Sequence, residues 1–200
     1  MNTTEHILSY WFGDEFVDGY PSKPRDALWF QSNPKTDQEI KSRFAPDIER
    51  AAKGQLDLWR KEPRGLLALI TLLDQFPRNV YRGTARAFAY DARARELCML
   101  GIDRGADKEL RSIERTFFYL PLEHSEQLAD QNLCVELMEK LVEEVSARHK
   151  KKALSYLSYA RSHQKIIAEF GRFPHRNAIL GRESSLAEAE FLQTGPNFGQ

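Results

Sequence analysis

The chain has 200 residues, which is long enough to bury one substantial hydrophobic core. It carries 29 Lys and Arg against 29 Asp and Glu, so it lacks the positive field that draws a protein to nucleic acid or to anionic lipid. We therefore expect a single all-helical domain over residues 1–200 that binds neither nucleic acid nor membrane, and any recognition by charge has to be local.

Apolar residues recur with helical spacing along almost the whole chain, so the expected elements are helices. In chain order, helices are predicted over residues 5–12, 24–30, 36–54, 64–76, from 91 to the Gly-rich turn at 101–107, then 107–119, 125–150, 152–170 and a short one after 185. Residues 194–200 are expected to fray.

Caps and prolines set the expected ends of these helices. Proline should kink or split the third helix at Pro46 and should end later ones at Pro77 and Pro121. Gly13 and Gly171 are expected helix ends. The predicted N-terminal caps are two capping boxes, Thr36 with Glu39 and Ser185 with Glu188, and two single residues, Asp91 and Asp107.

Many helices joined by short Gly and Pro turns predict antiparallel neighbours packed pair upon pair. No fixed repeat of about 34 residues is evident, so a regular tetratricopeptide array is not expected. The two cysteines, Cys98 and Cys134, lack any metal-ligand spacing and are expected to be buried thiols. Without a secretory leader, and with a longest apolar run, 66–73, too short to cross a bilayer, the chain is expected in the cytoplasm.

Two similar segments, "DQFPRNVYRG" at 74–83 and "GRFPHRNAILGR" at 171–182, are the most informative part of the sequence. Each places Phe-Pro where an apolar helix is expected to end, and follows it with arginine, asparagine and glycine. Such a turn would present a rigid cluster of cationic and amide donors, which suits an anion.

The functional interpretation is that both turns, together with "LEHSEQLAD" at 122–130, line one polar pocket. The structural interpretation is that the arginines pair with nearby acids and only tie helix ends together. In that case Arg78, Arg82, Arg176 and Arg182 would pair with Asp74, Glu123, Glu126 and Glu183. The predicted ligand-binding residues of the pocket are Asp74, Arg78, Asn79, Arg82, Arg172, His175, Arg176 and Asn177.

Histidines supply the candidate catalytic groups. His163 shares a helical face with Tyr156, Ile166 and Ile167, so a packing role competes with a chemical one. His124 or His163 could act as a general base with Glu123 as its orienting carboxylate. The same groups with His175 could in principle hold a divalent metal, but the spacing gives no support, and neither a metal nor a cofactor is expected.

No Gly-rich nucleotide loop and no Gly-x-Ser-x-Gly turn occurs in the chain. The aromatic residues fall at helical spacing near helix ends, and they are therefore predicted to be core side chains. They are Trp11, Phe12, Trp29, Phe30, Phe117 and Phe118.

Three segments, "LLDQFPRNVYRGTARAFAYD", "FFYLPLEHSEQLADQ" and "HQKIIAEFGRFPHRNAILGRESS", resemble the bacterial domain-of-unknown-function family 924 over nearly the whole chain. The resemblance implies an all-α fold of antiparallel helix pairs stacked in a tetratricopeptide-like right-handed superhelix; it implies no activity. The motif positions of that family are occupied here in the expected way by Asp74, Gln75, Arg78, Asn79, Arg82, Glu123, His124, His163, Arg172, His175, Arg176 and Asn177.

Two functions of different class remain. The preferred one is a binding or scaffold module whose pocket accepts an anionic group, such as a phosphate, a small carboxylate or the C-terminus of a protein partner. The alternative is a small hydrolase or transferase in which Arg78 and Arg176 stabilise a developing anion. A third possibility is that the polar motifs serve only to close the fold.

Overall fold

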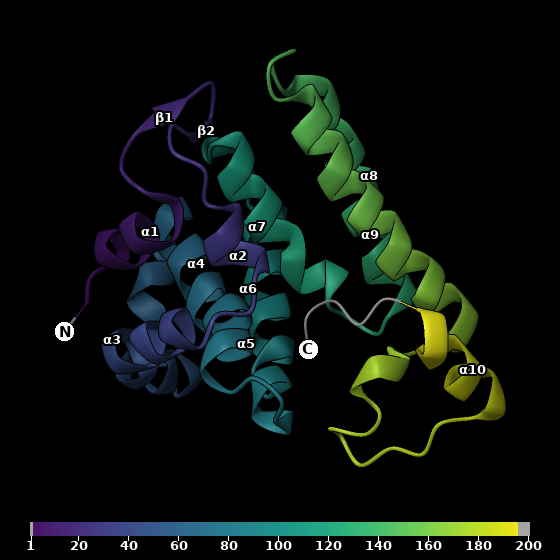
Figure 1. The fold of residues 1–200 in the computed structure, drawn as a ribbon. Helices are drawn as coiled ribbons and strands as arrows, with labels where there is room; N and C mark the ends of the chain where they lie inside the picture. Colours follow the sequence, from purple (N-terminus) through teal and green to yellow (C-terminus); the bar gives the residue numbers. More distant parts are fainter. Residues whose placement is uncertain (1, 196–200) are drawn as a thin grey trace.

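A computed structural model of the chain describes residues 2–195, and Figure 1 shows that these residues are almost entirely helical. The elements are α1 Thr4–Phe12, β1 Phe16–Val17, β2 Tyr20–Pro21, α2 Asp26–Phe30, α3 Pro34–Ala52, η1 Asp57–Lys61, α4 Pro63–Ile70, η2 Thr71–Gln75, α5 Phe76–Val80, η3 Ala85–Phe88, α6 Asp91–Asp103, η4 Ala106–Glu109, α7 Ser112–Glu123, α8 Leu128–Glu144, α9 Lys150–Phe170, η5 Pro174–Arg176 and α10 Leu186–Thr194. The predicted all-α class is confirmed.

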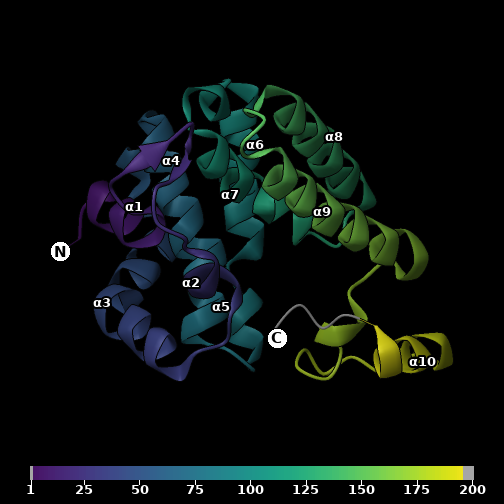
Figure 2. The same cartoon turned by 45° about the horizontal axis from the view of Figure 1, so that its top comes forward.

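The hydrophobic core is centred on α4, in which every residue from 65 to 70 is buried. Helices α1, α6 and α7 pack around α4, and α3 packs against α5. Helices α8 and α9 form an antiparallel pair beside α7, and they lie side by side in both views (Figures 1 and 2). Beyond the end of α9, η5 and α10 close a smaller cluster around Ile166, Ile167 and Phe173.

The helix predicted to end at Pro77 instead continues to Val80, so the first Phe-Pro step lies inside a helical rod. The rod passes through η2, a π-helical turn in which the Phe76 N–H donates to the Thr71 carbonyl five residues back. A π turn is wider than an α turn, and proline has no N–H to leave unsatisfied, so the ring is accommodated without ending the helix. Only the second Phe-Pro step follows a helix end, at Gly171.

Several predicted boundaries differ because other groups take the capping roles. Helix α3 begins at Pro34, with Asn33 accepting from the Lys35 N–H, and it contains Pro46 without a break. Thr36 is therefore inside the helix and does not cap it. Helix α7 likewise extends past Pro121 to Glu123.

The two aspartates predicted to be caps are used for tertiary contacts instead. The Asp91 carboxylate accepts from the Arg78 guanidinium, and that of Asp107 accepts from the Tyr119 hydroxyl at 2.6 Å. The cap at Ser185 and the C-terminal glycines Gly13 and Gly171 are as predicted.

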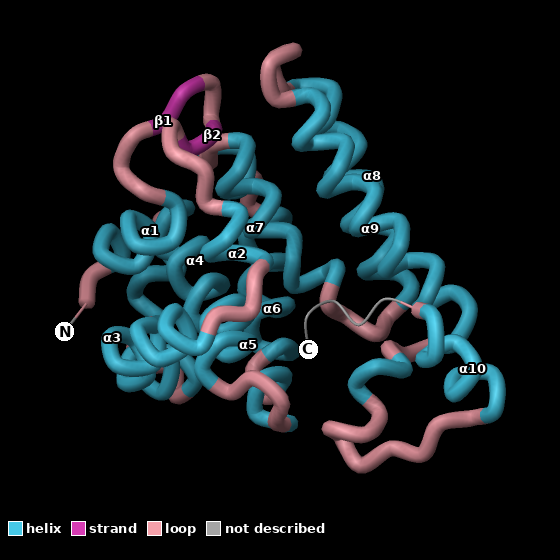
Figure 3. The backbone as a smooth tube through the Cα atoms, viewed as in Figure 1, coloured by secondary structure: helices cyan, strands magenta, loops and turns pink. Residues whose placement is uncertain are grey.

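The β1–β2 hairpin was not predicted (Figure 3). Each strand has two residues, which is too short for an alternating apolar pattern to be recognised. Its turn has Asp18 and Gly19 with φ of 49° and 80°, in the left-handed region.

Within residues 2–195, every helix is too short or too polar to cross a lipid bilayer. The frayed tail predicted for residues 194–200 falls mostly outside the described residues. The right-handed superhelix and the single-domain organisation stay predictions.

Candidate functional site

A cavity of about 620 Å³ lies between α2, α5, α7, α9 and η5. It is lined by Asp26, Trp29, Phe30, Gln31, Gln75, Arg78, Asn79, Arg82, Phe88, Thr116, Phe117, Leu120, Glu123, His124, Lys152, Ser155, Tyr156, Tyr159, His163, His175 and Arg176. Segments around residues 80, 120 and 175, far apart in the chain, therefore share one hollow.

Most of the predicted site residues line this cavity. Those from the ligand-binding set are Arg78, Asn79, Arg82, His175 and Arg176, and those from the catalytic set are Glu123, His124 and His163. Asp74 is fully buried behind this wall. Arg172 and Asn177 lie outside the lining, because Arg172 pairs with Glu188 and the Asn177 amide donates to the Ser184 hydroxyl at 3.1 Å.

The π turn η2 positions the first group of polar residues. It exposes Gln75 to the cavity while the neighbouring Asp74 stays buried. The side chains of Gln75 and Arg78 both bond to Asp74, Gln75 to its carboxylate and Arg78 to its backbone carbonyl. Arg78 also donates two bonds of 3.0 Å to Asp91, so its hydrogen-bonding capacity is largely used within the protein.

Asp37 of α3 holds the next two cavity residues. Its carboxylate accepts from the Asn79 amide at 2.8 Å and from two nitrogens of Arg82 at 2.9 and 3.1 Å. Arg82 therefore pairs with an acid, as the structural interpretation predicted. The acid is Asp37 of α3, however, and not one of the four acids that the sequence suggested.

The turn between α7 and α8 is held by the buried amide of Gln131. Its Nε2 donates to the carbonyls of Glu123 at 2.6 Å and Ser125 at 2.7 Å, which belong to the end of α7 and the turn after it. Carbonyls at a helix C-terminus lack an intrahelical N–H donor, and the Gln131 amide supplies the missing hydrogen bonds. Glu123 and His124 are thereby fixed at the cavity wall.

Glu126, in the same turn, anchors the second Phe-Pro segment. Its carboxylate accepts from the Phe173 N–H at 2.9 Å and from both terminal nitrogens of Arg182 at 2.7 and 2.9 Å. The pairing of Arg182 was predicted as a structural alternative. The bonds of Glu126 to Phe173 and Arg182 hold η5 at the cavity, where His175 and Arg176 form part of the lining.

His124 is held by Asp74, not by Glu123 as the sequence suggested. His124 Nδ1 lies 2.8 Å from Asp74 Oδ1. Burial opposes ionisation of Asp74, but Arg78 and His124 outweigh it and lower the pKa of the carboxyl to about 2. An ionised carboxylate only accepts, so Nδ1 carries the proton and Nε2 carries the lone pair. Burial, reinforced by Arg78, lowers the pKa of His124 and keeps the ring neutral.

Glu123 and His163 form a second, uncharged pair. Burial, with the nearby Asp74 charge, raises the pKa of Glu123 to about 8, so its carboxyl keeps its proton at neutral pH. Burial lowers the pKa of His163 to about 3, and its Nδ1 donates to the Tyr159 carbonyl at 2.9 Å. The 3.3 Å separation between His163 Nδ1 and Glu123 Oε1 is therefore a contact between neutral groups.

Arg176 is the cation whose environment differs most from that of the other cavity arginines. It is only 6% exposed, and its Cζ lies over the rings of Phe88 and Phe173, at 4.7 and 4.4 Å from their centroids. Its nearest acid is Asp91 at 3.6 Å, which already binds Arg78, and among the described residues its Nε has no hydrogen-bond partner. Burial, with repulsion from Arg78, lowers the pKa of Arg176 to about 10.

Sequence reasoning missed the acids behind the wall and the aromatic side of the cavity. Asp91 was predicted only as a helix cap and Asp37 was given no role, so only their distance in space identifies them as partners of the cavity arginines. Phe30 was predicted to be a core residue, but it lines the cavity and is 56% exposed.

Within the described part of the chain, no group of three or more His, Cys, Asp or Glu side chains is arranged to hold a metal.

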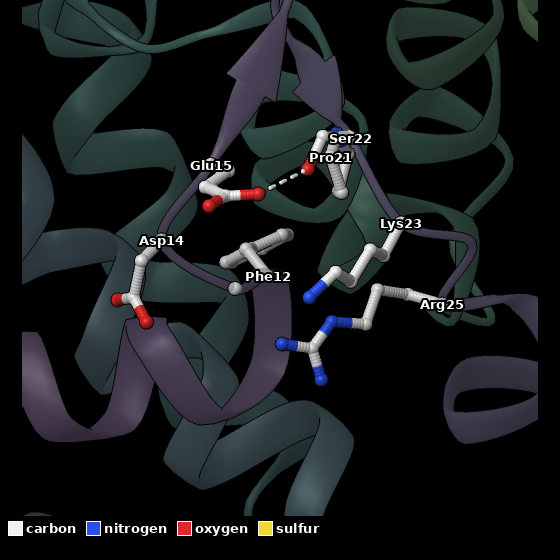
Figure 4. A pocket seen from close by; sticks show the side chains of 8 residues that line it. Phe12, Asp14, Glu15, Pro21, Ser22, Lys23 and Arg25 are labelled. Carbon is white, nitrogen blue, oxygen red and sulfur yellow. Dashed lines mark hydrogen bonds between the residues drawn. The ribbon is translucent and has the colours of Figure 1, made fainter.

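A smaller hollow of about 170 Å³ lies beside the hairpin, at the C-terminus of α1 (Figure 4). The Arg25 side chain points toward the end of this helix and donates to the carbonyls of Tyr10 at 3.3 Å and Ser9 at 3.4 Å. Cations commonly satisfy the last carbonyls of a helix in this way, so we assign this hollow a structural role.

Comparison with known proteins places the chain among bacterial relatives. A family described as "Bacterial protein of unknown function (DUF924)" matches residues 7–196. A solved structure of a protein of unknown function, ATU0120 from Agrobacterium tumefaciens, is 39% identical over 84% of this chain and 89% of that one, with a TM-score of 0.75. No curated protein matches the chain. The chain therefore belongs to the DUF924 family of bacterial proteins of unknown function.

Proposed function

We propose that this protein binds an anionic group in the cavity between α5, α7, α9 and η5, with Arg176 as the principal cationic contact. The observation that carries the proposal is the Arg176 guanidinium, which lines the cavity while its closest acid oxygen, on Asp91, lies 3.6 Å from Nη1 and already accepts from Arg78. Burying a cation without full compensation is costly, and a ligand anion would supply the missing partner.

The distribution of charge around the cavity supports the same proposal. Arg78, Arg82 and Arg176 line the wall, whereas their acidic partners, Asp37, Asp74 and Asp91, do not. At the polar end, Glu123 is protonated at neutral pH, because burial raises its pKa to about 8. A ligand there would meet cations and neutral donors, and the planar fork of arginine suits a phosphate or a carboxylate.

The test replaces Arg176 by methionine and measures thermal stability and calorimetric binding with inorganic phosphate, acetate and succinate. The wild type should be stabilised by at least one of these anions, and Arg176→Met should lose the response. Because Asp91 keeps its two bonds to Arg78, the variant should fold, with a free energy of unfolding within about 1 kcal/mol of the wild type or above it.

The matched control is Arg161→Met, which removes an exposed arginine paired with Glu139 outside the cavity and should leave the response unchanged. An equal response in wild type and Arg176→Met, or no response of the wild type, contradicts the proposal. Unfolding of Arg176→Met would assign this residue to the scaffold.

A second candidate function, a hydrolase or transferase, is favoured by the bond between Asp74 and His124. A buried carboxylate that fixes the imidazole tautomer leaves Nε2 as a base, and a protonated Glu123 beside it can act as an acid. In a hydrolysis, His124 Nε2 would take a proton from water, the resulting hydroxide would attack the substrate, and Glu123 would give its proton to the leaving group.

This alternative is tested with p-nitrophenyl acetate and p-nitrophenyl phosphate as substrates. Turnover by the wild type that falls about 100-fold or more in His124→Gln, while phosphate binding persists, would support it. Equal turnover in both proteins would reject His124 as the base.

We also propose that the protein is cytoplasmic. Cys98 and Cys134 are both buried free thiols, which is compatible with a reducing compartment.

A further inference from the structure

The cavity is much larger than an inorganic anion requires. Its volume of about 620 Å³ lies in the range of pockets that enclose organic ligands, roughly 300–1,000 Å³. One water molecule accounts for about 30 Å³ of liquid, so a phosphate or an acetate would occupy only a small part of the space.

Much of the remaining wall consists of aromatic rings, together with the polar side chains of Asp26, Thr116, Lys152 and Ser155. Trp29 and Phe30 come from α2, Phe117 from α7, and Tyr156 and Tyr159 from α9. Trp29 is locked in place because its Nε1 donates to the Trp11 carbonyl at 2.9 Å. The result is a preformed apolar wall beside the polar one.

Along two helices of the wall an aromatic residue precedes a histidine by the same number of residues. Along α7, Phe117 precedes His124 by seven residues, and along α9, Tyr156 precedes His163 by seven residues. Both helices run antiparallel to α8 and therefore parallel to each other (Figure 1). Seven residues of helix span about 10 Å, so the aromatic and the polar parts of the cavity are separated by about the length of a small aromatic acid.

Two aromatic residues of the lining are exposed to solvent. Phe30 and Tyr159 both line it, and they are 56% and 58% exposed. The ring centroid of Phe30 lies 6.3 Å from that of Phe117, and the two ring planes are 20° apart. It lies 6.0 Å from the ring centroid of Tyr156. Exposed aromatic side chains that adjoin one another beside a cavity are typical of ligand-binding grooves.

We infer that the ligand is a small organic anion with an aromatic body, whose phosphate or carboxylate head meets Arg176 and whose ring lies against Phe30, Phe117 and Tyr156. This inference rests on the proposed anion site and adds the class of ligand. The anionic head and the aromatic body of a test compound can be varied independently. The experiment therefore distinguishes failure of the anion site from failure of the aromatic ligand class.

The experiment measures dissociation constants by calorimetry for two series with constant head groups. The first series is inorganic phosphate, phenyl phosphate and 1-naphthyl phosphate; the second is acetate, 3-phenylpropionate and 3-(1-naphthyl)propionate. Because each ring removes apolar surface from water, affinity should rise along at least one series by about tenfold or more. Phe30→Ala should remove most of this gain and leave binding of the bare head unchanged.

Leu58→Ala is the matched control, since it truncates an apolar side chain that is 77% exposed and lies outside the cavity. Binding of phosphate or acetate without any gain from the rings overturns this inference and leaves the anion site intact. Ring-dependent binding that persists in Arg176→Met overturns it as well, because the head would then not be recognised.

Failure of every probe to bind rejects the anion site and this inference together. One further arm uses N-acetylglycylphenylalanine, a short peptide with a free carboxylate. Tighter binding of this peptide than of 3-phenylpropionate would assign the cavity to a protein C-terminus and overturn the small-molecule ligand.

Discussion

Glu123 and Asp74 are two buried carboxyl groups in one polar cluster with opposite ionisation. Asp74 is surrounded by Arg78, His124 and Gln75, and it stays charged. Burial and the charge of Asp74 both raise the pKa of Glu123, so its carboxyl stays protonated. Two titratable groups whose environments separate their pKa values are typical of ligand-binding and catalytic sites, although ion-pair networks also produce them.

The state of Glu123 leads to a prediction about stability and pH. In the unfolded chain its carboxyl has a pKa of 4.5, and in the folded protein the pKa is raised to about 8. Between these values the folded state holds one more proton, so its contribution to stability is complete below pH 4.5 and is lost as the pH rises toward 8. The free energy of unfolding should fall by up to about 1.4 kcal/mol per pH unit.

The difference in stability between the wild type and Glu123→Gln isolates this effect, because the histidines contribute equally to both proteins. In the wild type alone the buried histidines act in the opposite direction around pH 6.5, since His163 and His175 have folded pKa values of about 3 and 4 against an unfolded value of 6.5, so that stability rises as their unfolded forms lose a proton. Urea denaturation should show that the stability of the wild type relative to that of Glu123→Gln falls as the pH rises from 4.5 to 8. A difference that stays constant over this range would mean that Glu123 is ionised in the folded protein.

At the scale of elements, the cavity depends on short connections more than on the long helices. The π turn η2 brings Asp74, Gln75 and Arg78 to one place, and the α7–α8 turn brings Glu123, His124 and Glu126 to another. Glu126 joins this turn to η5 through the Phe173 N–H and Arg182. Three connections distant in sequence therefore define the polar wall.

Replacing Glu126 by glutamine should loosen η5 without unfolding the protein. The variant loses the charged bonds to Arg182, while the core around α4 is untouched. Amide exchange of residues 171–182 should become at least about tenfold faster, and phosphate binding should weaken because Arg176 is less well placed. Glu139→Gln, at an exposed pair with Arg161, should change neither property. Unchanged exchange in Glu126→Gln would contradict the anchoring role of Glu126.

At the scale of the whole molecule, the cavity lies where two parts of the structure meet. The main core includes residues from α1 to α9, whereas Ile166, Ile167 and Phe173 form a separate small cluster with Phe170 and Phe191. Arg176 comes from the segment beside the small cluster and faces residues of the main body. A ligand between them would join both parts, so binding should stabilise the second Phe-Pro segment together with α5 and α7.

The sequence by itself determined the helical class, several helix ends and the two polar motifs. These features are local, because each depends on residues within one or two helical turns. They include the periodicity of the apolar residues, the capping box of Ser185 with Glu188, and the helix end at Gly171. The family resemblance added that these motifs belong to one kind of protein, and the comparisons confirm the family.

Only the tertiary structure decided which charges meet. Arg82 pairs with Asp37, 45 residues away, and Arg182 pairs with Glu126, 56 residues away. The partner of an arginine depends on distance in space and on what else is buried nearby, and no local pattern encodes either. For the same reason the sequence predicted Phe30 as core and Glu123 as the partner of His124, whereas packing exposes the first and brings Asp74 to the histidine.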